Sequence, residues 1–130
     1  MGPPKALVIS SEPLARKVLD RLLRRYGYWA QLAAGELDAL DALEETDFDL
    51  LVLDTDTTDL DWSGLVKLVR VSRLGMEPLP VVALTSGHGG AADELDQLAV
   101  EAVLTKPLSP RVFLEALTGL SARGASSRSG

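Results

Sequence analysis

The run Asp49-Leu50-Leu51-Val52-Leu53-Asp54 decides the fold, because four consecutive apolar residues stand between two carboxylates. An apolar run of this length without polar alternation is typical of a strand that is buried on both faces. Such strands occur in parallel sheets with helices packed on either side. We therefore expect an α/β protein in which this run forms a central strand.

Similar runs recur on both sides of it, at Ala6–Ile9, Trp29–Leu32, Pro80–Thr85 and Ala102–Thr105. Helical periodicity separates them, and we predict helices that begin after Ser11 and end near Gly27, and that span about 36–45, 64–73, 91–98 and 109–120. Ser11 and Ser109 are the predicted N-caps, and Gly27 is the predicted C-terminal cap. Leu14 and Leu37 are expected to join the apolar faces of the first two helices. Five strands that alternate with five helices predict a doubly wound five-stranded parallel sheet of flavodoxin-like strand order.

The composition fits one globular domain. Of the 130 residues, 46% are apolar and 25% are charged, and we place the domain at residues 1–121. Residues 122–130 are rich in Ser, Gly and Arg, so we expect a disordered tail or a linker stump there. No apolar run is long enough to span a bilayer and no signal peptide is recognisable. With no cysteine in the chain, thiol chemistry is excluded and a cytoplasmic location is expected.

A net charge of −6 argues against non-specific binding of nucleic acid. Basic residues nevertheless gather in the first helix, at Arg16, Lys17, Arg21, Arg24 and Arg25. We interpret this cluster as a solvated helix face, and the alternative is a docking surface for an acidic partner.

Polar residues stand at the carboxyl ends of four of the predicted strands: Ser10 and Ser11, then Asp54, Thr85 and Lys106. The carboxyl ends of parallel strands meet at one edge of the sheet, where doubly wound proteins bind their ligands. The sequence therefore predicts that a carboxylate, several hydroxyls and an ammonium group lie close together.

From about Lys5 to Leu120 the chain resembles the receiver domains of bacterial response regulators. The resemblance rests on Asp54, Thr85 and Lys106-Pro107, each behind its apolar run, and on Glu12-Pro13 and Tyr26-Gly27-Tyr28 around the first helix. It implies that Asp54 is the phosphoacceptor nucleophile, that Lys106 pairs with a phosphoryl oxygen, and that Thr85 hydrogen-bonds another.

The chain departs from the family at the metal site. Receiver domains hold Mg²⁺ with two consecutive acidic residues after the first strand, and Ser10 and Ser11 stand there instead. Two further departures are Thr58, in place of a proline, and Val103, in place of the aromatic residue that switches rotamer. Valine has one stiff torsion and cannot make that movement.

Loss of two carboxylates weakens the attraction for a divalent cation, and serine hydroxyls are poor ligands for Mg²⁺. With Lys106 free to neutralise Asp54, we expect weak or absent Mg²⁺ binding and slow or absent phosphorylation. Asp54 would remain as one metal ligand. Either Asp56 or Glu12 could rebuild the site. The family supplies a backbone carbonyl to the metal at the position of Asp56, and the Asp56 side chain is expected to point elsewhere.

The leading hypothesis is an atypical, non-enzymatic receiver of a bacterial phosphorelay that acts by protein–protein contact, with a sensor histidine kinase or a downstream effector as partner. The chain would be a monomer or a weak homodimer. One alternative is a receiver that is phosphorylated at Asp54 through a rebuilt metal site. Another is a flavodoxin-like cofactor binder that holds a phosphate at Ser10-Ser11. We interpret His88 as a solvated loop residue, and Trp62 either covers the rim near Asp54 or contacts a partner.

Overall fold

The computed structural model describes the backbone of residues 2–87 and 91–129, with side chains described as far as residue 120. Five strands, β1 (Lys5–Ile9), β2 (Trp29–Ala33), β3 (Leu50–Asp54), β4 (Val81–Thr85) and β5 (Ala102–Thr105), form one sheet in the order β2-β1-β3-β4-β5. Every neighbouring pair is parallel. The predicted flavodoxin-like doubly wound sheet is confirmed.

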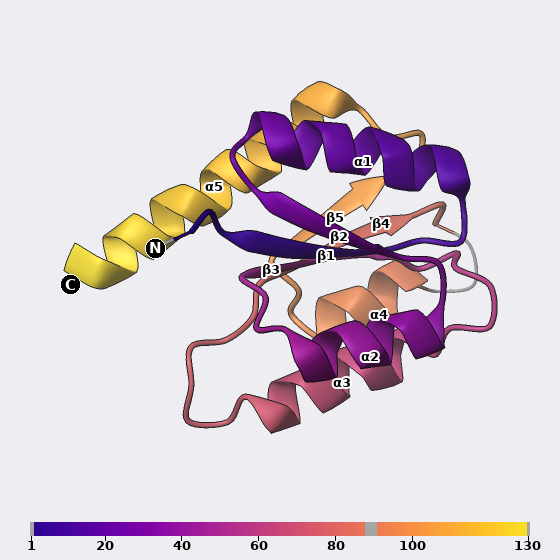
Figure 1. Ribbon diagram of the computed structural model, residues 1–130, viewed down its shortest axis with the longest axis horizontal. Helices are drawn as coiled ribbons and strands as arrows, with labels where there is room; N and C mark the ends of the chain where they lie inside the picture. The colour runs from indigo at the N-terminus through magenta and orange to yellow at the C-terminus, as the bar shows by residue number, and fades with distance from the viewer. Residues whose placement is uncertain (1, 88–90, 130) are drawn as a thin grey trace.

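The helices cover both faces of the sheet (Figure 1). Helices α1 (Pro13–Arg25) and α5 (Pro110–Ser129) lie on one face, and α2 (Glu36–Glu45), α3 (Trp62–Ser72) and α4 (Ala91–Gln97) lie on the other. All connections therefore cross from the end of one strand to the start of the next, and the carboxyl ends of the strands share one edge. No helix within the described ranges has the length and apolarity that a membrane span requires.

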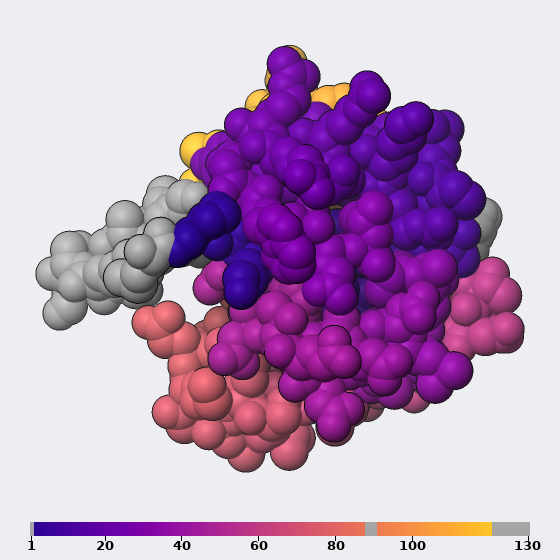
Figure 2. Space-filling model, viewed as in Figure 1, coloured from indigo at the N-terminus to yellow at the C-terminus, as the bar shows by residue number. Residues whose placement is uncertain are grey.

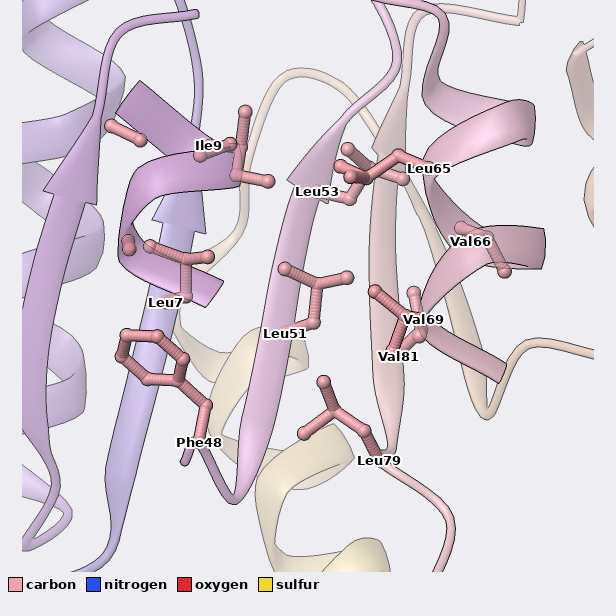
Figure 3. Close-up of a cluster of buried hydrophobic side chains, with 13 residues drawn as sticks. Leu7, Ile9, Phe48, Leu51, Leu53, Leu65, Val66, Val69, Leu79 and Val81 are labelled. Carbon is pink, nitrogen blue, oxygen red and sulfur yellow. The ribbon is translucent and has the colours of Figure 1, made fainter. Parts of the chain in front are cut away.

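Strand β3 joins two hydrophobic cores because its side chains alternate between the faces of the sheet. Leu51 and Leu53 belong to the core beneath α2 and α3, where Figure 3 shows them opposite Val66 and Val69 of α3. Leu50 and Val52 belong to the core that α1 and α5 cover. All five residues of β3 are buried, so the strand fixes its terminal residue, Asp54, firmly in the sheet.

The structure contradicts the expectation that Leu14 and Leu37 join the apolar faces of α1 and α2. Leu14 is 73% exposed and Leu37 is 78% exposed. The buried stripe of α1 runs through Leu19, Leu22 and Leu23, and that of α2 runs through the small residues Ala39 and Ala42. The small side chain of alanine permits close approach of α2 to the sheet. The spacing of the leucines predicted a neighbouring face of the helix instead.

The helix ends follow from local chemistry with one exception. Gly27 has a φ of 99°, as its predicted role as a cap requires, and the Ser109 hydroxyl accepts a hydrogen bond from the Val112 N–H at 3.3 Å. The prediction of Ser11 as the N-cap of α1 is wrong. Glu12 occupies that position, and Pro13 begins the helix.

Helix α5 extends to Ser129, nine residues past its predicted end at Leu120. Ala122, Arg123 and Ala125 are good helix formers, and elongation of an existing helix needs no new nucleus. The division of the chain at residue 121 stays a prediction.

The surface in the space-filling view belongs mainly to the N-terminal half of the chain (Figure 2). Here β2 forms one edge of the sheet, with α1 on one side of it and α2 on the other. Lys17, Arg21, Arg24 and Arg25 of α1 are exposed, which agrees with a solvated face and with a docking surface alike.

Candidate functional site

The Asp54 carboxylate lies at the centre of the site and is 1% exposed. Its Oδ2 accepts a hydrogen bond of 2.7 Å from the Ser10 hydroxyl. Its Oδ1 accepts one of 3.0 Å from the Asp56 N–H and lies 2.7 Å from the Lys106 ammonium nitrogen. Groups from the ends of β1, β3 and β5 thus satisfy both oxygens, which is what a buried carboxylate requires.

Ser10 reaches Asp54 because β1 and β3 are neighbours in register. Ile9 pairs with Leu53, so Ser10, which follows β1, lies beside Asp54, the last residue of β3. Ser10 is 0% exposed, and its oxygen also accepts a hydrogen bond from the Glu12 N–H at 3.2 Å. Its carbonyl accepts a bond of 2.7 Å from the Arg16 guanidinium. These contacts hold the hydroxyl in one position, aimed at Asp54.

The Lys106 ammonium binds three carboxylates. Besides Asp54, it lies 3.1 Å from Glu12 Oε1 and 3.2 Å from Asp56 Oδ2. An ammonium group has three N–H donors, so each of them has one carboxylate partner. Burial lowers the pKa of Lys106, but the bonds to Asp54 and Glu12 outweigh it and hold that pKa above its usual value. The group is therefore a permanent cation at any ordinary pH.

Asp56 connects the loop after β3 to the loop after β4. Its Oδ2 accepts a bond of 3.1 Å from the Ser86 N–H, and its Oδ1 accepts one of 2.9 Å from the Ser86 hydroxyl. Burial raises the pKa of Asp56, but the hydrogen bonds from Ser86 and Lys106 outweigh it and lower that pKa overall. The expectation that this side chain points away from the site is wrong, because Lys106 and Ser86 together attract it.

The structure separates the two remaining hydroxyls from Asp54. The Thr85 Oγ1 is buried at the end of β4 and accepts a hydrogen bond of 3.1 Å from the Gly87 N–H. The Ser11 hydroxyl accepts one of 3.2 Å from the Thr58 N–H. Neither hydroxyl is a hydrogen-bond partner of the carboxylate. Both instead organise the loops that surround it.

Sequence reasoning missed Ser86 and Thr57. The Thr57 hydroxyl, which is 5% exposed, donates to the Asp54 carbonyl at 2.7 Å and closes the turn after β3. Ser86 directly follows β4, so its position at the carboxyl edge of the sheet was the signal that could have found it.

Three further residues were singled out in the sequence. Val103 is 41% exposed on β5, and the Lys106-Pro107 peptide bond that follows the strand is cis. Trp62 begins α3 and packs, partly buried, against the core beneath that helix, so it is anchored at the helix and not free on the surface. His88 lies outside the described residues.

The carboxylates of the site converge on an ammonium group. Within residues 2–87 and 91–120, no three His, Cys, Asp or Glu side chains are grouped as ligands of one metal ion would be. All buried polar side-chain atoms in these ranges have a hydrogen-bond partner. The arrangement is thus internally satisfied, with Ser10 and Lys106 as the partners of Asp54.

Comparison with known proteins places this site in a family. The chain matches the response regulator receiver domain over residues 6–118. The sensory/regulatory protein RpfC of Xanthomonas campestris pv. campestris is 29% identical to it over 119 residues, which cover 90% of this chain and 16% of RpfC. Protein-glutamate methylesterase/protein-glutamine glutaminase 1 of Anaeromyxobacter dehalogenans is 33% identical over 117 residues, covering 86% of this chain and 32% of that protein. The chain thus spans less than a third of either relative.

Solved structures show the same fold. A CheY-like receiver domain protein from Methanospirillum hungatei JF-1 has a TM-score of 0.82 and 19% identity, and the alignment covers 95% of this chain and 98% of that one. The chemotaxis response regulator CheY4 of Vibrio cholerae has a TM-score of 0.77 and 23% identity, with coverage of 88% and 96%. The family match runs from β1 into α5 and includes every residue of the site from Ser10 to Lys106, so the chain belongs to the response-regulator receiver domains of two-component signalling.

Proposed function

We propose that this receiver domain acts through protein–protein contact, with weak or no Mg²⁺-dependent phosphorylation at Asp54. The buried hydrogen bond from Ser10 Oγ to Asp54 Oδ2 is the observation that carries the proposal. Ser10 stands at a position where the family resemblance implies an acidic metal ligand. A hydroxyl that donates its one proton to Asp54 brings no negative charge and directs a hydrogen toward the carboxylate, which is the opposite of what a cation needs.

The other contacts of Asp54 support the same proposal. Its Oδ1 already interacts with the Lys106 ammonium at 2.7 Å and with the Asp56 N–H at 3.0 Å. A Mg²⁺ ion on Asp54 would compete with this cation and with the Ser10 hydroxyl, while gaining only one negative charge from Asp54. The residues at the usual positions therefore do not fit the ion.

Titration with Mg²⁺, followed by the fluorescence of Trp62 and Trp29, tests the proposal. We expect no saturable change in the millimolar range for the native chain. The variant Ser10→Asp/Ser11→Asp, which restores the acidic pair, should gain one. Treatment with acetyl phosphate and Mg²⁺ should leave the intact mass of the native chain unchanged. An increase of one phosphoryl group that Asp54→Asn abolishes would contradict the proposal.

A phosphorylatable receiver with a rebuilt metal site is the second candidate, and one observation favours it. Glu12 and Asp56 both turn toward Lys106, so one ammonium and three carboxylates give the site a formal charge of −2. If this charge recruits Mg²⁺, Asp56→Asn and Glu12→Gln should each weaken binding to the native chain. The exposed variant Asp59→Asn is the control, because Asn tolerates the positive φ of 57° at that position.

The same proposal covers partner and location. A sensor histidine kinase or a downstream effector would be the partner, and the face of α4, β5 and α5 would be the contact surface, by analogy with the family. Val103 and Val112 are exposed on β5 and α5, at 41% and 42%, and supply apolar contacts there. The domain would be a cytoplasmic, non-enzymatic monomer or weak homodimer. A cofactor phosphate at Ser10 has no support, since the Asp54 carboxylate 2.7 Å from that hydroxyl would repel it.

A further inference from the structure

A single carboxylate links the two loops that border the site. Asp56 follows β3, and its side chain reaches the first residue after β4, thirty positions later in the sequence. Ser86 meets it with two donors, the backbone N–H at 3.1 Å and the hydroxyl at 2.9 Å. The third donor is the Lys106 ammonium at 3.2 Å. Two strand ends, those of β4 and β5, therefore present three hydrogen-bond donors to one anionic group that follows β3.

These donors form a pocket for an anion. An ammonium, a backbone N–H and a hydroxyl that converge on one group can bind either a carboxylate or a phosphoryl group, because both are charged acceptors. The pocket adjoins the Asp54 side chain, since the same Lys106 nitrogen lies 2.7 Å from Asp54 Oδ1. An anionic group attached to Asp54 would lie close to Lys106, and Asp56 already interacts with that ammonium.

We propose that the Asp56 carboxylate is a built-in anion that fills the pocket between Lys106 and Ser86 and thereby holds Ser86 and Gly87, the first two residues after β4, in one arrangement. This inference rests on the proposed function and gives it a mechanism. A receiver without phosphoryl input still needs a defined signalling surface. Asp56 supplies the negative charge from within the chain.

The neighbouring contacts explain how Ser86 and Gly87 are held. Ser86 is bound by Asp56 from the side of β3, and the next residue, Gly87, donates its N–H to the buried Thr85 hydroxyl at 3.1 Å. Two consecutive backbone amides are thus fixed by side chains of two different strand ends. Loss of Asp56 frees the first amide and leaves the second in place.

Amide hydrogen exchange at Ser86, measured by NMR on the full chain without divalent cations or phosphodonors, tests this inference. Asp56→Ala should raise the exchange rate of the Ser86 N–H by roughly ten- to a hundredfold, the factor that corresponds to one charge-assisted hydrogen bond. Asp59→Asn, in the same loop but without contact to Lys106, should leave it unchanged. Exchange of the β3 amides reports whether each variant remains folded.

Chemical rescue separates an anion pocket from a merely structural contact. Asp56 is one third exposed, so a small anion can reach the space that Asp56→Ala vacates. Formate should slow the Ser86 exchange in Asp56→Ala, whereas it should have no effect on the native chain. Should Asp56→Ala fail to fold, Asp56→Asn keeps the size of the side chain and removes its charge, and Ser86 exchange should still rise.

An unchanged Ser86 rate in both Asp56 variants would overturn the inference, as would a formate effect equal in native and variant chains. The outcome is independent of phosphorylation. If the intact mass shows that Asp54 accepts a phosphoryl group, the proposed function fails while the exchange result still decides the role of Asp56. If Asp54 remains unmodified and the Ser86 exchange rate is the same in the native chain and the Asp56 variants, only the inference about Asp56 fails.

Discussion

Ser10 and Asp54 are 44 residues apart in the sequence and share a buried hydrogen bond of 2.7 Å. The bond joins the ends of two neighbouring strands, so it serves the sheet as well as the site. An acidic residue in place of Ser10 would bring two carboxylates into contact and would depend on a cation to hold them. Serine joins the ends of the two strands by a hydrogen bond and needs no cation.

Ser10→Ala should therefore destabilise the domain, because it leaves Asp54 Oδ2 buried without its hydroxyl donor. A hydrogen bond to a charged group contributes about 1.5–3 kcal/mol, and we expect a loss of that size in the free energy of unfolding by urea at pH 7. Ser63→Ala, in the first turn of α3, should change it by less than about 0.5 kcal/mol. Equal effects of the two substitutions would show that the Ser10 bond adds nothing.

Lys106→Met should lower the free energy of unfolding more than Ser10→Ala does, since it leaves three carboxylates around an apolar side chain. Removal of one partner from a buried ion pair typically costs about 3 kcal/mol, measurable by urea unfolding. Lys67→Met, on the exposed face of α3, is the matched control and should be nearly neutral. In the double variant Asp54→Asn/Lys106→Met part of the loss should be recovered, and strict additivity would argue against direct coupling.

The lowered pKa of Asp56 predicts the acid side of the stability profile. Partners that favour the carboxylate stabilise the fold fully above the ordinary value of 3.8, and this stabilisation is lost as the pH falls through the lowered folded value. Native chain and Asp56→Asn should thus differ in unfolding free energy at pH 7, and the difference should shrink in strong acid. A difference that grows on acidification would refute the assignment of Asp56 as a hydrogen-bonded anion.

The raised pKa of Lys106 predicts the alkaline side, with the opposite sign. Its contribution is complete below the ordinary value of 10.5 and is lost only as the pH rises through the still higher folded value. The cost of Lys106→Met in urea unfolding should therefore be constant between pH 7 and 10. A cost that already declines near pH 8 would mean that Lys106 titrates normally.

Phe113→Ala tests the core between α1, α5 and the sheet. Phe113 is 0% exposed, and truncation of a buried phenylalanine costs about 3–5 kcal/mol because a cavity remains. The preceding residue, Val112, is 42% exposed, so Val112→Ala should cost less than about 0.5 kcal/mol. Urea unfolding of both variants measures this contrast. Similar losses for the two variants would contradict the burial of Phe113 between α5 and the sheet.

The sequence predicted the sheet well because apolar runs leave few alternatives. The run that ends at Asp54 and the run that ends at Thr85 have the predicted carboxyl ends in the structure, and the parallel pairing of the strands followed from their alternation with helices. Register then brings Ser10 beside Asp54, and Lys106 follows β5 at the same edge of the sheet. Periodicity was less informative for helix faces, where Ala39 and Ala42 are buried and Leu37 is exposed.

The direction of individual side chains could not be predicted in the same way. Asp56 has no periodic pattern to fix it, and its orientation depends on the ammonium of Lys106 and on Ser86, which come from distant parts of the chain. Glu12 likewise turns to Lys106, across 94 positions of sequence. Such contacts depend on charges that meet only after the sheet has formed.

Strand β3 has a consequence for how this domain tolerates mutation. Leu50 and Val52 pack in one core, Leu51 and Leu53 pack in the other, and Asp54 continues the same backbone. Protein interiors are densely packed and transmit strain, so a volume change on either side of the sheet displaces the same carboxylate. Genetic suppressors of a defect at Asp54 should thus arise in both helical layers, and evolutionary drift in one layer constrains the residues acceptable in the other.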